Sequence, residues 1–238
     1  MKKVLLVYTG GTIGMITDPV TGSLKPFNFD QITSEVPEIK KIDCEISSLS
    51  FETPIDSSNM NPATWVELAE IIEVNYENYD GFVVLHGSDT MAYTASALSF
   101  MLQNVNKPIV FTGSQLPIGV VRTDGKENLI TAIEIAAAYE NEKPIVAEVC
   151  IYFEYQLYRG NRTTKINAAH FEAFESFNYP KLAEAGIDII YNRSFIRQSD
   201  DEALRVSTGY NSNVGVLKLF PGISQEFVQH FFQMPKLK

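Results

Sequence analysis

Hydroxyl side chains beside glycines recur where three apolar runs end, and these are the residues best placed to carry chemistry. The segments read T-G-G-T at 9–12, G-S-D-T at 87–90 and T-G-S-Q at 112–115. A fourth segment, D-S-S-N at 56–59, follows a weaker apolar run. Glycine lets the backbone approach a ligand closely, and hydroxyls with backbone N–H groups suit a carboxylate or an oxyanion. Together the four loops predict a small polar pocket.

Two charged residues extend this chemistry. Asp89 suits an ammonium group, so the ligand predicted for the pocket is a small zwitterion. A hydroxyl nucleophile needs a base, which can be a lysine kept neutral by burial or charge. Lys165 follows Thr163 and Thr164 in a polar turn after a fourth apolar run. Its spacing alone does not distinguish it from a solvated surface lysine.

Other chemistries find less support in the sequence. Residues 10–14 read G-G-T-I-G, which is neither G-x-G-x-x-G nor a P-loop, and this argues against a nucleotide. The histidines at 86, 170 and 230 are scattered without metal-ligand spacing, so we expect neither a metal nor another cofactor. His86 closes an apolar run, and we interpret it as a hydrogen-bonded core residue rather than a catalyst.

Alternating elements predict the fold that positions these loops. Apolar runs at 3–8, 81–86, 108–112 and 144–153 are typical of strands buried on both faces, and 45–51 favours a weaker strand. Helices are predicted from Pro62, capped by Asn61, and over 90–103 and 124–139. This order predicts an α/β fold with a doubly wound, mostly parallel sheet. Ligands of such sheets bind at the carboxyl ends of the strands.

The C-terminal part changes character. We predict an N-terminal catalytic domain at 1–191, a polar linker at 192–213 and the incomplete start of a smaller second α/β domain at 214–238, with a strand at 214–220 and a helix at 224–233. One strand and one helix cannot bury their own apolar faces. They either pack back on the main sheet or begin a second domain, which we favour, and we expect this segment to be disordered, swapped between chains or buried in a dimer contact.

Composition excludes several classes of partner. The 238 residues are 45% apolar and 20% charged, as in ordinary globular proteins. The net charge of −10 would repel nucleic acid and anionic membranes. The apolar start is too short for a signal peptide, and no run approaches the length of a membrane span. Cys44 and Cys150 show no metal or redox spacing, so we interpret them as thiols in a reducing compartment and predict a cytoplasmic protein.

From Val4 to about Gln233 the chain resembles the bacterial L-asparaginases, in particular their cytoplasmic type I branch. The segments that carry the resemblance are T-G-G-T-I-G at 9–14, D-S-S-N-M at 56–60, D-G-F-V-V-L-H-G-S-D-T-M-A-Y-T-A-S-A-L-S-F at 80–100, T-G-S-Q at 112–115, Y-R-G-N-R-T-T-K at 158–165 and P-G-I-S at 221–224.

The resemblance implies hydrolysis of L-asparagine to L-aspartate and ammonia through an acyl-enzyme. It makes Thr12 the nucleophile and completes the catalytic set with Ser88, Asp89 and Lys165. The substrate would be held by Asp56, Ser57, Ser58, Ser88, Asp89 and Ser114. Full-length members form homodimers or homotetramers, and the family's smaller C-terminal domain continues beyond the end of this chain.

Two positions depart from the family pattern. The family usually has threonine where this chain has Ser88, which keeps the hydroxyl but loses the methyl that restricts its rotamer. The family's mobile loop usually carries a tyrosine that hydrogen-bonds the nucleophile. Residues 15–29 contain only Phe27 and Phe29 as aromatics, with Leu24 or Lys25 near the expected place.

Two alternatives stay open. The asparaginase-like subunit of a tRNA-dependent amidotransferase shares these loops, although we would expect an additional N-terminal β-barrel there, and the acidic charge disfavours tRNA. A truncated module that binds aspartate or asparagine with little turnover is the non-enzyme alternative.

Overall fold

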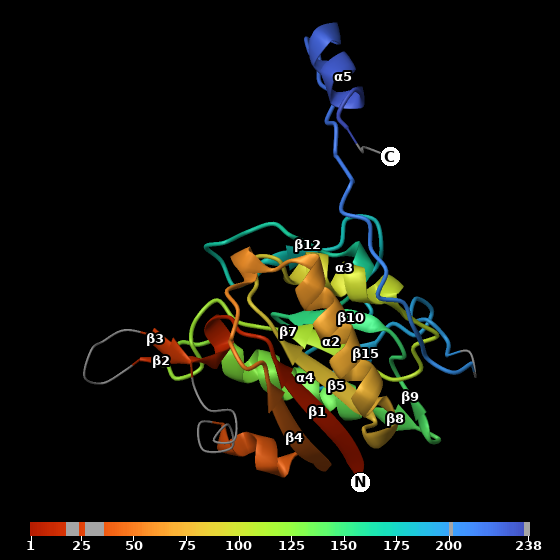
Figure 1. Ribbon diagram of the computed structural model, residues 1–238. Coiled ribbons are helices and arrows are strands. Elements are labelled where there is room, and N and C mark those ends of the chain that lie inside the picture. The colour runs from red at the N-terminus through yellow and green to blue at the C-terminus, as the bar shows by residue number, and fades with distance from the viewer. Residues whose placement is uncertain (18–23, 27–35, 200–201, 236–238) are drawn as a thin grey trace. The chain divides into compact units, whose positions relative to one another are not determined.

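The computed structural model describes residues 1–17, 24–26, 36–199 and 202–235 (Figure 1). Two compact units divide the chain, Met1–Ser207 and Thr208–Lys238, and each is described by itself. Phe27 and Phe29, which the sequence places in the family's mobile loop, lie outside the described residues.

An eight-stranded sheet forms the centre of the first unit, in the order β15-β14-β11-β10-β7-β5-β1-β4. Five strands are parallel: β1 (Lys2–Tyr8), β4 (Cys44–Ser50), β5 (Gly81–Leu85), β7 (Ile109–Thr112) and β10 (Val149–Phe153). The sheet is extended by antiparallel β11 (Gln156–Arg159), β14 (Ala183–Ala185) and β15 (Ile189–Tyr191). The mostly parallel sheet and the five strands predicted for this unit are confirmed, although the strand predicted over 144–153 joins the sheet only over Val149–Phe153.

The order of the parallel strands determines where a ligand can bind. Across the sheet they run β4-β1-β5-β7-β10, so the chain moves to one side of β1 for the second strand and to the other side for the third. The loops leaving β1 and β5 therefore diverge around a switch point, which in open α/β sheets is the crevice where ligands bind.

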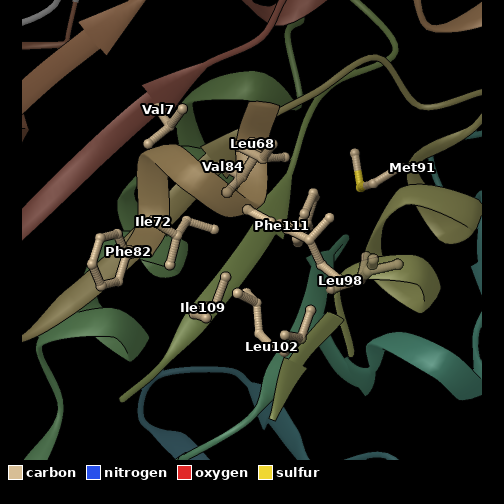
Figure 2. Close-up of a cluster of buried hydrophobic side chains, with 14 of the residues drawn as sticks. Val7, Leu68, Ile72, Phe82, Val84, Met91, Leu98, Leu102, Ile109 and Phe111 are labelled. Carbon is tan, nitrogen blue, oxygen red and sulfur yellow. The ribbon is translucent and has the colours of Figure 1, made fainter. Parts of the chain in front are cut away.

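Three helices cover the two faces of this sheet (Figure 1): α2 (Pro62–Asn75), α3 (Met91–Met101) and α4 (Gly125–Ala137). Side chains of β1 alternate between the faces, because successive residues of a strand point to opposite sides. Val4 and Leu6 belong to the core that includes α4, whereas Leu5 and Val7 belong to the core formed with α2 and α3. Figure 2 shows part of this second core, in which Leu68 and Ile72 of α2 lie near Phe82 and Val84 of β5.

The first turn of α2 follows from its sequence. Asn61 accepts hydrogen bonds from the backbone N–H groups of Ala63 and Thr64, at 3.0 and 3.4 Å, and Pro62 occupies the first helical position. An asparagine side chain satisfies backbone donors that the helix leaves unpaired, and proline has no N–H to satisfy there. All three predicted helices of this unit are confirmed.

Short elements connect this framework. They are η1 (Thr12–Gly14), β2 (Met15–Thr17), β3 (Leu24–Pro26), η3 (Pro37–Lys41), η4 (Ser57–Asn59), η5 (Tyr76–Asn78), β6 (Leu102–Gln103), β8 (Tyr139–Glu140), β9 (Lys143–Pro144), η6 (Gly160–Arg162), β12 (Thr164–Lys165), β13 (Phe174–Glu175) and β16 (Arg205–Val206). Within the predicted linker, β16 pairs antiparallel with β6, and Leu204 and Val206 pack against the second core. The predicted domain boundaries themselves stay a prediction.

The second unit contains one regular element, α5 (Gln225–Phe232), within the part of it that the structure describes. Ser224 caps this predicted helix by accepting a hydrogen bond from the Phe227 N–H at 3.1 Å. The strand predicted for residues 214–220 does not form. A strand needs a neighbour to hydrogen-bond its backbone, and the described residues of this unit supply none.

We predict that Ile72→Ala lowers the free energy of unfolding by about 2–5 kcal/mol, because it leaves a cavity in the core between α2 and the sheet. Val74→Ala on the same helix is the matched control. The Ile72 side chain is fully buried and that of Val74 is 77% exposed, so the control should change stability by less than about 0.5 kcal/mol. Urea unfolding of both variants measures this, and equal losses would contradict the packing described.

Candidate active site

Glycines bring the loops after β1, β4 and β5 into direct contact. Gly10 and Gly11 have φ values of +135° and +91°, which side chains with a Cβ rarely adopt. A Cβ on Gly11 would lie 2.5 Å from the Cα and N of Gly87, and a Cβ on Gly10 would overlap the backbone of Ile55. The turn that carries Thr12 is therefore packed against the loops that carry Asp56 and Ser88.

The loop after β5 also interlocks with the loop after β4. A Cβ on Gly87 would lie 2.6 Å from Ser57 Oγ, and the Thr90 hydroxyl donates to the Ser57 carbonyl at 2.6 Å. Ser57 takes part in these contacts, and Thr12 and Ser88 directly follow the glycines Gly11 and Gly87 that form them. The structure thus gathers the hydroxyl-bearing loops at the switch point, as their places after the strands predict.

Lys165 connects with the loop after β5. Its Nζ donates to Ser88 Oγ at 2.8 Å and to Asp89 Oδ1 at 2.7 Å. The lysine side chain is 13% exposed and that of Asp89 is 63% exposed, so the ion pair opens to solvent on the carboxylate side. The antiparallel pairing of β12 with β13 holds Lys165 in place. Three of the four predicted catalytic residues thus form one hydrogen-bonded group.

Gln115 completes this group and was not among the predicted site residues. The Ser88 hydroxyl donates to Gln115 Oε1 at 3.2 Å, while Gln115 Nε2 donates to the His170 carbonyl at 2.9 Å. Ser88 Oγ therefore accepts a hydrogen bond from Lys165 and donates one to Gln115. The signal available in the sequence is that Gln115 directly follows Ser114 at the same edge of the sheet.

Asp124 anchors the loop that carries Gln115. Its carboxylate accepts the N–H groups of Gln115 and Leu116 at 2.8 and 3.1 Å. Asn128 of α4 donates to the Gly113 carbonyl at 3.0 Å. Burial raises the pKa of Asp124 above its usual range, although the backbone hydrogen bonds oppose this shift.

Several predicted hydroxyls are engaged by the backbone. Ser114 is buried and donates to the Leu116 carbonyl at 2.6 Å. Thr9 donates to the Leu85 carbonyl at 3.1 Å, and Thr112 donates to the Tyr152 carbonyl at 2.8 Å. Contact between Ser114 and a substrate stays a prediction, and it requires the ligand to donate to Ser114 Oγ.

Asp56 and Ser58 form a small turn at the end of β4. The Asp56 carboxylate accepts the Ser58 N–H and the Ser58 hydroxyl, both at 2.9 Å, and these bonds lower the pKa of Asp56. Both hydrogen bonds lie at the surface, whereas Ser57 is buried. The carboxylate is therefore ionised at neutral pH and can attract an ammonium group.

Tyr8 supports the turn that carries Thr12. Its hydroxyl lies 3.2 Å from the Gly14 carbonyl and 3.4 Å from that of Gly11, and a Cβ on Gly14 would overlap the Tyr8 ring. Burial raises the pKa of Tyr8 to about 12, so its hydroxyl remains a donor across the physiological range.

His86 is fully buried, as expected of a core residue. Its Nδ1 lies 2.7 Å from the Gly87 carbonyl and its Nε2 lies 2.9 Å from Thr94 Oγ1. Burial lowers the pKa of His86 to about 4. The interpretation of His86 as a hydrogen-bonded core residue is confirmed.

A cavity of about 540 Å³ adjoins the ion pair, lined among others by Asp89, Tyr93, Lys165 and Asn167. Thr12 does not line it. Among the described residues, no three His, Cys, Asp or Glu side chains are grouped so as to hold a metal ion. No helix in the described part of the chain is long and apolar enough to cross a membrane.

Known proteins resemble this chain over most of its length. The family model described as "Asparaginase, N-terminal" matches residues 3–197. The chain belongs to the asparaginase family. This asparaginase-family chain is 42% identical to L-asparaginase 1 of Escherichia coli strain K12, over 98% of its own length and 68% of that protein.

Two further matches widen the comparison. The crystal structure of L-asparaginase I from Vibrio cholerae O1 biovar eltor superposes with a TM-score of 0.88 at 39% identity, covering 98% of this chain and 69% of that one. A glutamyl-tRNA(Gln) amidotransferase protein of Pyrococcus abyssi is 34% identical over 96% of this chain and 53% of that protein. Both enzyme types that the sequence leaves open are therefore among the relatives of this chain.

We predict that His86 makes the protein less stable as the pH falls. The unfolded state binds a proton to His86 below its ordinary pKa of 6.5, whereas the folded state does so only near 4. The contribution of neutral His86 to the free energy of unfolding is thus fully present above pH 6.5 and is lost progressively as the pH falls toward 4. It should be about 2 kcal/mol smaller at pH 5 than at pH 7.

Urea unfolding of the wild type and of His86→Asn at pH 7, 6 and 5 measures this effect. The variant should be less stable at pH 7 and should lose less stability on acidification, since it has no imidazole to protonate. Parallel pH dependences of the two proteins would contradict the assignment.

Proposed function

We propose that this chain hydrolyses the side-chain amide of L-asparagine, giving L-aspartate and ammonia. The observation that carries the proposal is the hydrogen-bonded group of Lys165, Ser88 and Asp89 at the switch point of an asparaginase-family sheet. It supplies a hydroxyl, an adjacent lysine and a carboxylate beside the loop of a second hydroxyl, Thr12. These are the parts that nucleophilic hydrolysis of an amide requires.

The proposed reaction has two steps. Thr12 Oγ1 attacks the amide carbon, and its proton passes through Ser88 to Lys165. The C–N bond then breaks as the nitrogen takes this proton back from Lys165 and leaves as ammonia. Water then attacks the Thr12 ester, releasing aspartate and returning a proton to Thr12. Splitting amide hydrolysis in this way replaces one difficult step by two easier ones.

The remaining site residues hold the α-substituents of the substrate. Asp89 and Asp56 bind the α-ammonium group, which also donates to Ser114 Oγ, and Ser58 holds the Asp56 carboxylate in place through its two hydrogen bonds. The Ser57 hydroxyl donates to the α-carboxylate. The carboxylates of Asp56 and Asp89 favour a cationic group at this position. Cys44 and Cys150 are free thiols, which supports a reducing compartment, and we place the enzyme in the cytoplasm.

The amidotransferase relative offers a second function for the same loops. Such a protein would have to work close to a polyanionic tRNA, and the net charge of −10 opposes this. Asparaginase activity is therefore favoured over transfer of ammonia to tRNA. A module that binds asparagine without turnover is distinguished by whether ammonia is released.

We predict that Thr12→Ala and Lys165→Met each abolish ammonia release from L-asparagine, lowering kcat by at least about a thousandfold. Thr12→Ala should leave the affinity for L-aspartate within about tenfold, because the nucleophile contributes little to ground-state binding. Ammonia release and calorimetric titration with L-aspartate measure the two effects.

The controls are Thr12→Ser, which keeps a hydroxyl, and Lys181→Met, which removes a lysine from an exposed position. Both should retain turnover. Full activity of Thr12→Ala would indicate that Ser88 is the nucleophile instead of Thr12. A normal rate for Lys165→Met would indicate that this lysine has only a structural role. Binding of asparagine by the wild type without ammonia release would overturn the proposed function.

We further propose that the protein is a homo-oligomer. Within the second unit, the side chains of Phe227 and Phe232 are 58% and 69% exposed, and no residue of α5 is buried. Each large apolar side chain left in water forgoes about 1.5–3 kcal/mol. A second copy of the chain would cover these side chains.

Sedimentation of the chain with and without residues 214–238 tests this association. The full chain should sediment as a dimer or a larger species, and the shortened chain as a smaller one. A monomeric full chain whose solubility and melting temperature do not change on deletion would contradict it.

A further inference from the structure

A buried chain of hydrogen bonds lies next to the loop after β5 and joins Trp65 of α2, Thr94 of α3 and His86. Thr94 Oγ1 lies 3.1 Å from Trp65 Nε1 and 2.9 Å from His86 Nε2. His86 Nδ1 lies 2.7 Å from the Gly87 carbonyl oxygen. His86 is fully buried and Thr94 is 1% exposed. In such surroundings these bonds are stronger than they would be in water.

Chemistry sets the direction of every proton in this chain. The Gly87 carbonyl can only accept, so His86 Nδ1 carries the proton of the imidazole and donates to it. Nε2 of the neutral ring is then an acceptor, so the Thr94 hydroxyl donates to Nε2. The indole N–H of Trp65 can only donate, and its acceptor is Thr94 Oγ1. The Nδ1–H tautomer of His86 therefore satisfies every hydrogen bond of this network.

The orientation of the Gly87 carbonyl determines that of the Ser88 N–H. The peptide between them is planar and trans, so its C=O and its N–H point in opposite directions. Because the Gly87 carbonyl is turned toward the buried imidazole, the Ser88 N–H is turned away from it. No described residue accepts this N–H, whereas the preceding His86 N–H is bonded to the Thr112 carbonyl at 2.9 Å.

Resting on the proposed function, we propose that Trp65, Thr94 and His86 are positioning residues for the reaction. They fix the Gly87–Ser88 peptide so that the Ser88 N–H is free to donate to the oxyanion formed when Thr12 attacks the amide. A donor aimed in advance at developing charge is among the largest contributions to catalysis of acyl transfer. None of the three side chains touches the substrate in this arrangement.

The Thr94 hydroxyl makes this role different from simple packing. Without it, the buried lone pair of His86 Nε2 has no partner, while Nδ1 still donates to the Gly87 carbonyl at 2.7 Å. The imidazole is then held by one hydrogen bond instead of two, so the ring and the Gly87–Ser88 peptide bonded to it are less firmly fixed. The Ser88 N–H would move out of place.

Kinetics of Thr94→Val test the proposal. We expect kcat for L-asparagine to fall roughly ten- to a hundredfold, with KM and the affinity for L-aspartate changed less than about twofold. Thr94→Ser should restore kcat because it restores the hydroxyl. Trp65→Phe should have a smaller effect than Thr94→Val, since Thr94 can still donate to His86.

Thr131→Val is the matched control. Thr131 is a buried threonine of α4 whose hydroxyl donates to Glu127 Oε1 at 2.9 Å, outside this chain of hydrogen bonds. The substitution removes a buried hydroxyl in the same way and should keep the wild-type kcat. Nitrogen-15 NMR of the His86 ring should show the Nδ1–H tautomer in the wild type, and the Nε2 resonance should shift in Thr94→Val because that nitrogen loses its hydrogen-bond donor.

Three results would overturn the inference: an unchanged kcat in Thr94→Val, an equal loss in Thr131→Val, or an Nε2–H tautomer in the wild type. Failure of the proposed function is a separate result, in which the wild type itself releases no ammonia. The NMR measurement still decides the hydrogen-bonded chain in that case, because Nδ1–H supports it and Nε2–H overturns it.

Discussion

A side chain at position 11 would occupy space that the Gly87 backbone already fills, and the arrangement of the site follows from this exclusion. The Cβ of any other residue would lie 2.5 Å from Gly87 Cα, in a backbone conformation with φ of +91°. Only glycine tolerates both conditions. The contact joins the loops after β1 and β5 across the switch point, and Thr12 and Ser88 directly follow the two glycines that meet there.

Around this contact the hydroxyl groups divide into two sets. Thr9, Thr112 and Ser114 donate to backbone carbonyls and hold the ends of the strands and the loop after β7. Ser88 instead exchanges hydrogen bonds with the side chains of Lys165 and Gln115. A hydroxyl that bonds to another side chain can change partners during a reaction more readily than one that closes a strand end. The division thus separates the framework from the groups that can react.

This division marks the limit of what the sequence predicts. Apolar periodicity locates the sheet and α2, α3 and α4, because buried strands and helix faces have repeating patterns. The carboxyl ends of parallel strands lie at the same edge of the sheet, and this places Thr12, Ser88 and Asp89 together at that edge. Neither rule distinguishes Ser114, which bonds its own loop, from Gln115, which bonds Ser88, since side-chain partners depend on contacts between distant segments. The C-terminal residues show the same limit, because residues 214–220 have the apolar character of a strand but pair with no strand in the part of the chain that the structure describes. By contrast β16, in the predicted linker, finds such a partner in β6.

The ion pair of Lys165 with Asp89 links substrate binding to the chemistry of the proposed mechanism. Lys165 donates to Ser88 Oγ and to the exposed carboxylate of Asp89, so one side chain bonds both the proposed relay hydroxyl and the proposed ammonium-binding group. An α-ammonium group arriving at Asp89 is a second cation beside the same carboxylate. Two cations that share one carboxylate compete for its oxygens, so binding of the substrate weakens the bond between Asp89 and Lys165. On this argument Asp89 binds the zwitterion and, by sharing its oxygens between two cations, releases Lys165 toward Ser88.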